Sequence, residues 1–289
     1  LTGMDRAYFC NSGAESVEAA LKLTRRQKSR SKIVAAERAF HGRTLGALGT
    51  TYKSAYREPF RPLSEAAFVP YNDVEALKSA ATSDTGAVIL EPVQGEAGVY
   101  VAESDYLRAA REICDDRNAL LIFDEVQTGF GRTGEWFGKD HFSVKPDIMT
   151  LAKAMASGLP MGAMLASGDA ADALTKGDHG STFAGGPVVC AAALAVIDVI
   201  REEKLVARSR ENGAYLKSEL AKLGPREVRG LGLMVGIDLD ADCKSLVEKA
   251  LAQGVLINST GEHTLRLIPP LVVDKKEIDQ VVSVIGQSL

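Results

Sequence analysis

Short apolar segments alternate with longer amphipathic segments between residues 33 and 166. The apolar segments are residues 33–36, 67–70, 87–90, 119–123, 147–152 and 162–166. They are short and show no alternation of polar and apolar residues, which is typical of strands buried on both faces of a sheet. Between some of them the periodicity predicts helices, over 74–81 and 106–117. This order of elements predicts an α/β fold with a mostly parallel sheet.

The last third of the chain has a different organisation. We expect helices over 188–201 and 202–223, followed by a turn. After the turn, apolar strands and two helices follow without the regular strand–helix alternation. We therefore expect a large domain over 1–224 that includes the connecting helices, and a smaller C-terminal α+β domain over 225–289.

Composition excludes several classes of protein. The chain has 34 lysines and arginines against 38 aspartates and glutamates, so it lacks the basic surplus of nucleic-acid-binding domains. It has no apolar stretch of the roughly 18 residues that a membrane helix needs, and it does not begin like a signal peptide. Its four cysteines favour free thiols in a reducing compartment, and its four histidines show no metal-ligand spacing. We expect a cytoplasmic protein without a metal, a nucleic-acid partner or a membrane.

One predicted strand ends in two carboxylates. Residues 120–123 are apolar, and Asp124 and Glu125 follow at once. A carboxylate at the end of a buried strand needs a partner, because desolvating an unpaired charge is costly. Ligands of open α/β sheets also bind at the carboxyl ends of the strands. Asp124 is therefore a candidate for binding a cationic group, with a helix cap or a turn as the alternative.

Near the start of the chain, the sequence predicts a helix that could bind an anion at its first turn. Ser12 and Glu15 have the S-x-x-E spacing of a capping box in front of an amphipathic segment. Gly13 and Ala14 are small, so the free N–H groups of the first turn would be open to a phosphate. An ordinary capped helix explains the same residues.

Lys153 directly follows the predicted strand 147–152. A desolvated lysine loses its proton easily and can react as a neutral amine with an aldehyde, whereas a lysine that extends into solvent is the simpler alternative. The reactive lysine becomes the better interpretation when Lys153 is considered together with Asp124 and the anion-binding helix start. Pyridoxal 5′-phosphate needs an anion site, a carboxylate that keeps its pyridine nitrogen protonated, and a lysine that binds its aldehyde. We therefore expect Asp124 to pair with a pyridinium.

A glycine motif supports a competing interpretation. Gly129–Gly134 fits the dinucleotide fingerprint G-x-G-x-x-G literally. The fingerprint requires a helix that opens within the glycines and an acidic residue at the end of the next strand. Here no helical period follows, and Asp147 begins its strand. An NAD-dependent oxidoreductase is therefore kept only as an alternative.

Seven motifs along the chain occur together, in this order, in one known family. They are SGAES (12–16), FHGRT (40–44), EPVQGE (91–96), FDEVQTGFGRTG (123–134), LAKAM (151–155), GSTFAGG (180–186) and LRLIPPL (265–271). The chain thereby resembles the class III aminotransferases, in particular the acetylornithine aminotransferase branch with its relatives that act on acetylated or carrier-bound lysine. The resemblance implies fold type I of the pyridoxal-phosphate-dependent transferases and a homodimer with shared active sites.

The resemblance also implies roles for the motif residues. Lys153 would bind the cofactor aldehyde and then move a proton between the substrate carbon and the cofactor, and Asp124 would pair with the pyridine nitrogen. The other expected cofactor-binding residues are Ser12, Gly13 and Ala14 at the phosphate, Thr182 from the partner subunit with Ser181 beside it, Val126 and Phe40 on the two ring faces, and Gln127 at the phenolic oxygen.

Three more residues are implied to bind the substrates. Arg43 and Arg266 match carboxylate-binding arginines of the family, and an arginine binds a carboxylate through two parallel hydrogen bonds. Glu96 matches a glutamate that pairs with the second arginine. We expect this pair to be closed when the amine of an ω-amino donor enters and open when the α-carboxylate of glutamate arrives, which avoids an unpaired buried charge.

The implied reaction transfers the side-chain amino group of N-acetylornithine to 2-oxoglutarate. Its products are N-acetylglutamate semialdehyde and glutamate, as in arginine biosynthesis. The same chemistry on acetylated or carrier-bound lysine, on ornithine or on 4-aminobutyrate is the alternative. Relatives carry a long segment before the phosphate motif, so we expect this chain to be a fragment or incomplete, with an inactive cofactor-binding fragment as a further alternative.

Overall fold

The computed structural model describes all residues from Leu1 to Leu289, and they form two compact units. Unit 1 comprises Leu1–Pro92, Ala102–Gly129 and Gly138–Asp198. Unit 2 comprises Val93–Val101, Phe130–Phe137 and Val199–Leu289. The domain boundary that we expect between residues 224 and 225 stays a prediction.

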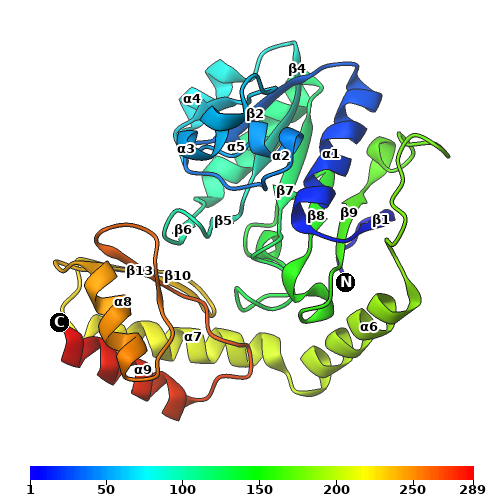
Figure 1. The fold of residues 1–289 in the computed structure, drawn as a ribbon. Helices are drawn as coiled ribbons and strands as arrows, with labels where there is room; N and C mark the ends of the chain where they lie inside the picture. Colours follow the sequence, from blue (N-terminus) through cyan, green and yellow to red (C-terminus); the bar gives the residue numbers. More distant parts are fainter. The chain divides into compact units, whose positions relative to one another are not determined.

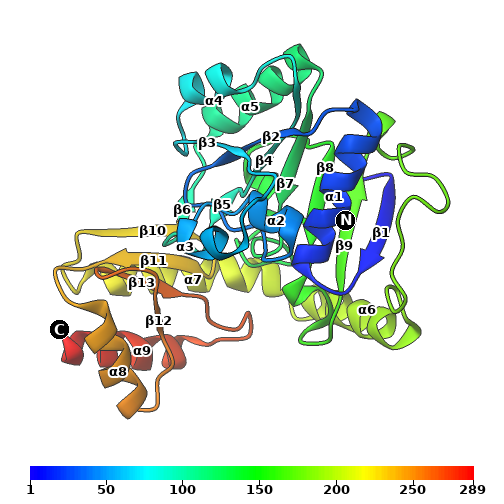
Figure 2. The same cartoon turned by 45° about the horizontal axis from the view of Figure 1, so that its top comes forward.

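A seven-stranded sheet organises unit 1 (Figures 1 and 2), in the order β1-β9-β8-β7-β4-β2-β3. Its strands are β1 (Arg6–Cys10), β2 (Lys32–Ala36), β3 (Ala67–Val69), β4 (Thr85–Leu90), β7 (Leu120–Asp124), β8 (Ile148–Leu151) and β9 (Gly162–Ala166). Neighbouring strands from β3 to β8 pair in parallel, whereas β9 is antiparallel to both β8 and β1. The mostly parallel sheet confirms the predicted fold class.

Helices α1 (Gly13–Lys28), α4 (Val74–Ala80) and α5 (Ser104–Arg117) contact this sheet and can be followed in Figure 2. The other helices that begin in unit 1 are α2 (Leu45–Gly49), α3 (Ser54–Arg57) and α6 (Pro187–Glu202), the last of which ends in unit 2. Single 3₁₀ turns occur at Glu58–Phe60, Gly138–His141, Lys153–Ala156 and Gly168–Ala170. The helices predicted over 74–81, 106–117 and 188–201 correspond to α4, α5 and α6.

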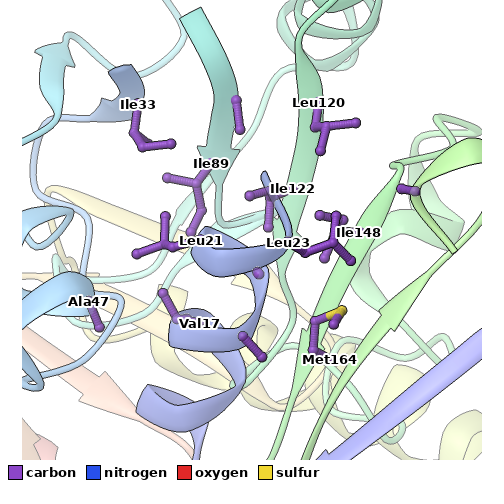
Figure 3. Close-up of a cluster of buried hydrophobic side chains, with 14 of the residues drawn as sticks. Val17, Leu21, Leu23, Ile33, Ala47, Ile89, Leu120, Ile122, Ile148 and Met164 are labelled. Carbon is purple, nitrogen blue, oxygen red and sulfur yellow. The ribbon is translucent and has the colours of Figure 1, made fainter. Parts of the chain in front are cut away.

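Helix α1 packs with its apolar side on the sheet, as Figure 3 shows. Val17 and Leu21 lie one turn apart on this side, and they belong to the same buried cluster as Ile89, Ile122 and Ile148 from three strands. Burying a large aliphatic side chain contributes roughly 1.5–3 kcal/mol. The packing therefore fixes the helix, and with it the first turn, relative to the strands.

Unit 2 contains an antiparallel sheet with the strand order β10-β11-β13-β12. Its strands are β10 (Glu227–Leu231), β11 (Met234–Asp238), β12 (Asn258–Ser259) and β13 (Thr264–Leu267), and its helices are α7 (Leu205–Ala221), α8 (Cys243–Ala252) and α9 (Lys275–Ser288). The separate hairpin of β5 (Val93–Gln94) and β6 (Tyr100–Val101) also belongs to this unit. Leucine, isoleucine and valine side chains of the helices and the sheet form one core.

The glycine motif Gly129–Gly134 forms turns, and no α-helix opens within it. The structural requirement of the dinucleotide fingerprint is therefore not met. Its arginine has a structural contact instead, because Arg132 donates to the backbone oxygens of Leu233 and Pro269 at 3.0 and 2.5 Å. None of the helices combines the length and the apolar character that crossing a bilayer requires.

Candidate active site

A cavity of about 500 Å³ lies in unit 1, where β4, β7 and β8 end. This volume falls within the range of small-molecule sites. The residues lining it that the sequence assigned to the cofactor or the substrate are Ser12, Gly13, Ala14, Phe40, Arg43, Asp124, Val126, Gln127 and Lys153. The fold thus brings together residues that are up to 141 positions apart in the chain, from Ser12 to Lys153 (153 − 12).

The first turn of α1 forms one wall of the cavity. Ser12 has an extended backbone, and its hydroxyl oxygen accepts a hydrogen bond from the N–H of Glu15 at 3.2 Å, so it caps the helix. The capping box is only half formed. In a complete box the Glu15 carboxylate would accept from the N–H of Ser12, but here it accepts from the N–H of Asn11 at 2.5 Å. The N–H groups of the first turn have no acceptor within the helix, and they are suited to bind an anion.

Gly13 allows the helix start to approach the chain after β7 closely. A Cβ atom at Gly13 would lie 2.8 Å from Cγ1 of Val126, closer than real Cβ contacts. Both residues line the cavity. The glycine therefore allows Val126 to lie next to the anion-binding turn. One ligand could then place a flat ring against Val126 and a phosphate at the turn.

Asp124 is the last residue of β7, and only 5% of it is exposed. Its Oδ1 accepts from the Thr150 hydroxyl at 2.9 Å and from the N–H of Val126 at 3.1 Å, and its Oδ2 lies 2.7 Å from Nδ1 of His41. An ionised carboxylate offers about four acceptor positions, so capacity remains for a cationic N–H. Asp124 is therefore suited to bind the pyridinium that the sequence predicts.

His41 is buried beside Asp124, with its Nδ1 2.7 Å from the Oδ2 of that carboxyl group. Burial lowers its pKa, but the hydrogen bond to Asp124 and the charge of that carboxylate raise it, and the net result is a raised pKa. Its second ring nitrogen, Nε2, is buried and has no hydrogen-bond partner. The pair is therefore a buried ion contact when His41 is protonated, and the raised pKa of His41 favours that protonated form.

Lys153 lies one residue beyond the end of β8, after Ala152, and begins a 3₁₀ turn. Its φ of 47° lies in the left-handed region, which is unfavourable for a residue with a side chain. Such strain is concentrated at functional sites, where the surrounding structure holds it. Lys153 lines the same cavity as Asp124.

Glu91 is a second carboxyl group at a strand end in this cavity, and the sequence analysis missed it. It follows β4, is only 4% exposed, and accepts a hydrogen bond from the N–H of Phe40 at 3.2 Å. Burial raises its pKa to about 8. The signal that could have identified it is the one used for Asp124, since both follow an apolar strand directly.

Glu125 stabilises the chain after β7. It is 1% exposed and accepts from the N–H groups of Gly138 at 2.6 Å and Lys139 at 2.7 Å, as well as from the Thr128 hydroxyl. Burial raises its pKa to about 7. The second carboxylate of the motif thus holds the turn that presents Val126.

Two predicted cofactor residues do not line the cavity. Ser181 and Thr182 are exposed in the segment between β9 and α6, and the Ser181 hydroxyl accepts from the Asn11 side chain at 3.0 Å. The sequence places Thr182 in the site of a partner subunit, so its role stays a prediction.

The two arginines expected to bind carboxylates have different surroundings. Arg43 lines the cavity and is exposed, and its guanidinium carbon lies 3.9 Å from the ring centroid of Tyr56. In unit 2, Arg266 of β13 donates to the Glu96 carboxylate at 2.5 Å and to the backbone oxygen of Gly95 at 3.1 Å. The glutamate and arginine that the sequence paired are therefore in contact.

The cavity can bind a phosphorylated, flat, cationic aldehyde. It combines open N–H groups at a helix start, a buried carboxylate with a free acceptor position, a lysine, and apolar side chains for the faces of a ring. These are the groups that pyridoxal 5′-phosphate requires.

Comparisons with known proteins agree with this geometry. The profile of the class-III aminotransferases matches residues 1–289. An acetylornithine aminotransferase of Methanosarcina acetivorans is 55% identical over all of this chain and 74% of the relative, and one of Archaeoglobus fulgidus is 49% identical over 98% and 76%. The crystal structure of ornithine aminotransferase from Toxoplasma gondii superimposes with a TM-score of 0.94 at 34% identity, covering 99% of this chain and 73% of that one.

Proposed function

The chain belongs to the class-III aminotransferases, and we propose that it transfers the side-chain amino group of N-acetylornithine to 2-oxoglutarate. The products are N-acetylglutamate semialdehyde and glutamate, so the enzyme serves arginine biosynthesis. The observation that carries the proposal is the meeting of Lys153, Asp124 and the start of α1 in one cavity. Relatives named acetylornithine aminotransferase, at 47–55% identity, support this donor.

The cofactor of this enzyme is pyridoxal 5′-phosphate, which supplies an electron sink for the negative charge that develops on the reacting substrate carbon. Ser12, Gly13 and Ala14 bind its phosphate through the open N–H groups of α1. Asp124 holds the proton on the pyridine nitrogen, and His41 and Thr150 orient the carboxylate for this task. The fold type I architecture agrees with that of the solved aminotransferases.

Lys153 has two tasks in the proposed mechanism. Its Nζ would hold the cofactor through the aldehyde carbon, a condensation that releases water, until a substrate amine takes its place. The freed Lys153 amine would then be the base that moves a proton at the reacting carbon of the substrate. The strained backbone at this residue supports a fixed position of the side chain at the end of β8.

Apolar and amide side chains orient the ring. Val126, next to Gly13, would pack on one face, and Phe40, whose N–H is bound by Glu91, would cover the other. Gln127 lines the cavity and would donate to the phenolic oxygen. Together these side chains would exclude water from the ring faces.

Two arginines bind the substrate carboxylates. We assign Arg43 to the carboxylate far from the reacting carbon, which both N-acetylornithine and 2-oxoglutarate carry. Arg266 binds the α-carboxylate of glutamate after Glu96 has moved away, and the closed pair accepts the N-acetylornithine amine instead. Acetylated or carrier-bound lysine, ornithine and 4-aminobutyrate are alternative donors for the same site.

We also propose a cytoplasmic homodimer with Thr182 of each subunit completing the partner's phosphate site. Support for the dimer comes from apolar residues that are solvent-exposed in and before α6, with Phe183 81%, Val188 74% and Leu194 63% exposed. Exposed apolar patches of this kind mark interaction surfaces. The four free cysteines support a reducing compartment.

The test of the proposed function is an absorption titration. The purified protein is loaded with pyridoxal phosphate, and the visible band of the lysine-bound cofactor is followed while N-acetylornithine is added. We expect the band to disappear with saturation at lower concentration than for N-acetyllysine, ornithine or 4-aminobutyrate, and 2-oxoglutarate to restore it. Lys153→Ala should never develop the band. A lower saturating concentration for one of the other amines would replace the proposed donor, and a band in Lys153→Ala would refute the role of this lysine.

A further inference from the structure

Arg43 has an aromatic neighbour. Its guanidinium carbon lies 3.9 Å from the ring centroid of Tyr56 and 6.0 Å from that of Phe40. Both distances lie within the range of cation–π contacts, and the contact with Tyr56 is the close one. Tyr56 lies in the short helix α3, outside the residues that line the cavity.

The two carboxylate-binding arginines are therefore held in opposite ways. Arg266 gives an N–H group to the Glu96 carboxylate, so a substrate has to displace that partner. Arg43 lies over the face of the Tyr56 ring, and a cation–π contact of this kind does not require an N–H group to be donated to an acceptor. A carboxylate needs two guanidinium N–H groups for bidentate binding. The ring thus holds Arg43 without a hydrogen-bond acceptor that a substrate would have to displace.

We infer that Tyr56 is a positioning residue that sets the orientation of Arg43, and thereby determines the preference for substrates with a second, distal carboxylate. The inference rests on the proposed function, because it takes Arg43 as the site of that carboxylate. It goes beyond the motif assignments, which contain no residue of α3.

The surroundings of Tyr56 support a positioning role. Its ring meets the Phe40 ring edge to face, with centroids 6.4 Å apart and an interplanar angle of 86°. Phe40 lines the cavity, so Tyr56 connects the guanidinium to the residue expected to cover the cofactor. The helix is anchored by Arg57, which is 7% exposed and donates to the backbone oxygen of Tyr52 at 3.0 Å.

A second cation shares the ring, and this defines the necessary control. Nζ of Lys53 lies 4.9 Å from the Tyr56 centroid. Loss of the ring would therefore release both Lys53 and Arg43. Lys53→Gln removes the lysine contact alone, and Tyr56→Phe keeps the ring face for Arg43 while removing only the hydroxyl.

The experiment uses the cofactor-loaded protein and two amino donors that differ at one end. Glutamate carries the distal carboxylate, and 2-aminopentanoate has a methyl group in its place. The half-reaction of each donor is followed by the cofactor band, and the dissociation constant of glutarate, which cannot react, is measured by calorimetry. We expect Tyr56→Leu to raise the dissociation constant of glutarate and the half-saturating glutamate concentration by roughly twofold to tenfold. The rate at saturation and the reaction of 2-aminopentanoate should stay unchanged.

The controls separate this inference from a structural effect. Tyr56→Phe and Lys53→Gln should behave like the wild type, and Tyr56→Leu should cause no further loss when Arg43→Gln is already present. An equal loss with 2-aminopentanoate, a defect in Tyr56→Phe, or a defect in Lys53→Gln that matches Tyr56→Leu would each overturn the inference.

Failure of the proposed function would look different. If Arg43→Gln binds glutarate like the wild type, the assignment of Arg43 is wrong. If glutamate reacts and N-acetylornithine does not, only the donor is wrong, and the comparison of glutamate with 2-aminopentanoate still decides the role of Tyr56.

Discussion

At the scale of single residues, the partners of Asp124 determine how well it holds a proton on a ligand. His41 contributes both a hydrogen bond at 2.7 Å and a charge when it is protonated. We predict that His41→Asn, which offers a neutral donor at a similar position, lowers the turnover rate by about tenfold, since one unit of pKa corresponds to a factor of ten. His41→Ala should have a larger effect because it also removes the donor.

Absorption spectra against pH check this prediction. The protonation midpoint of the bound cofactor should shift to lower pH in His41→Asn and further in His41→Ala. Thr51→Val serves as a control, because the Thr51 hydroxyl bonds only backbone groups, accepting from the N–H of His41 and donating to the oxygens of Gly42 and Ala47, and does not contact Asp124. Identical midpoints in all variants would show that His41 has no electrostatic role.

Glu91 makes stability depend on pH in a defined direction. Burial raises its pKa from 4.5 to about 8, so the folded protein keeps a proton that the unfolded chain loses between these values. The stabilisation by this proton is complete below about pH 4.5 and declines as the pH rises toward 8. Glu91→Gln stays neutral, so we predict that its free energy of unfolding rises relative to that of the wild type by roughly 4 kcal/mol between pH 5 and 8, at about 1.4 kcal/mol per pH unit.

Thermal unfolding of both cofactor-free proteins at a series of pH values measures this gain. Glu125, whose pKa burial raises to about 7, is present in both proteins, so its effect cancels in the difference. A difference in melting temperature that does not change with pH would contradict the raised pKa of Glu91.

At the scale of elements, the sequence predicted those strands and helices whose pattern comes from burial alone. All six predicted strands form, because a strand covered on both faces must be apolar throughout. Strand β1 (Arg6–Cys10) escaped notice because only Cys10 in it is buried. The second of the two helices predicted over 188–201 and 202–223 begins later than expected, at Leu205, because Lys204 adopts a left-handed conformation with φ 52°.

The first turn of α1 combines a structural and a binding role that substitutions can separate. Ser12→Ala removes the hydroxyl that accepts from the N–H of Glu15. We predict that the free energy of unfolding of the cofactor-free protein falls by about 1 kcal/mol. Ser12→Asp keeps a good cap, so its stability should remain, but its charge would repel the phosphate. We expect both variants to bind the cofactor more weakly than the wild type, and Ser12→Asp to lose more affinity than Ser12→Ala.

Chemical unfolding and cofactor titration measure the two effects on the same samples. A Ser12→Asp variant that binds pyridoxal phosphate as tightly as the wild type would exclude the phosphate from this helix start. Unchanged stability of Ser12→Ala would mean that the cap has no energetic importance.

At the scale of the whole molecule, the cavity contains many of the residues that the motifs indicated, because each motif lies at the end of a strand or the start of a helix. The sequence could have indicated Glu91, because it follows an apolar segment as Asp124 does. It could not indicate Tyr56, whose contact with Arg43 joins side chains from separate segments. Such a contact leaves no local pattern in the sequence.

The apolar side of α6 leads to a prediction about assembly. Val188, Ala191 and Ala195 are exposed at helical spacing, and Leu194 lies beside them with 63% of its surface exposed. A second copy of the chain would bury this stripe, whereas a charge in its centre would be desolvated at a cost. We predict that Leu194→Glu is monomeric in sedimentation experiments at concentrations where the wild type is a dimer.

Leu251→Glu is the matched control, because Leu251 of α8 is also a helical leucine with 57% exposure, and it should leave the dimer intact. If Thr182 completes the partner's phosphate site, monomeric Leu194→Glu should also bind pyridoxal phosphate more weakly, and adding Thr182→Ala should cause no further loss. A dimeric Leu194→Glu would remove the α6 stripe from the interface. A monomer with undiminished cofactor affinity would show that each phosphate site is complete within one chain, which would refute the predicted role of Thr182.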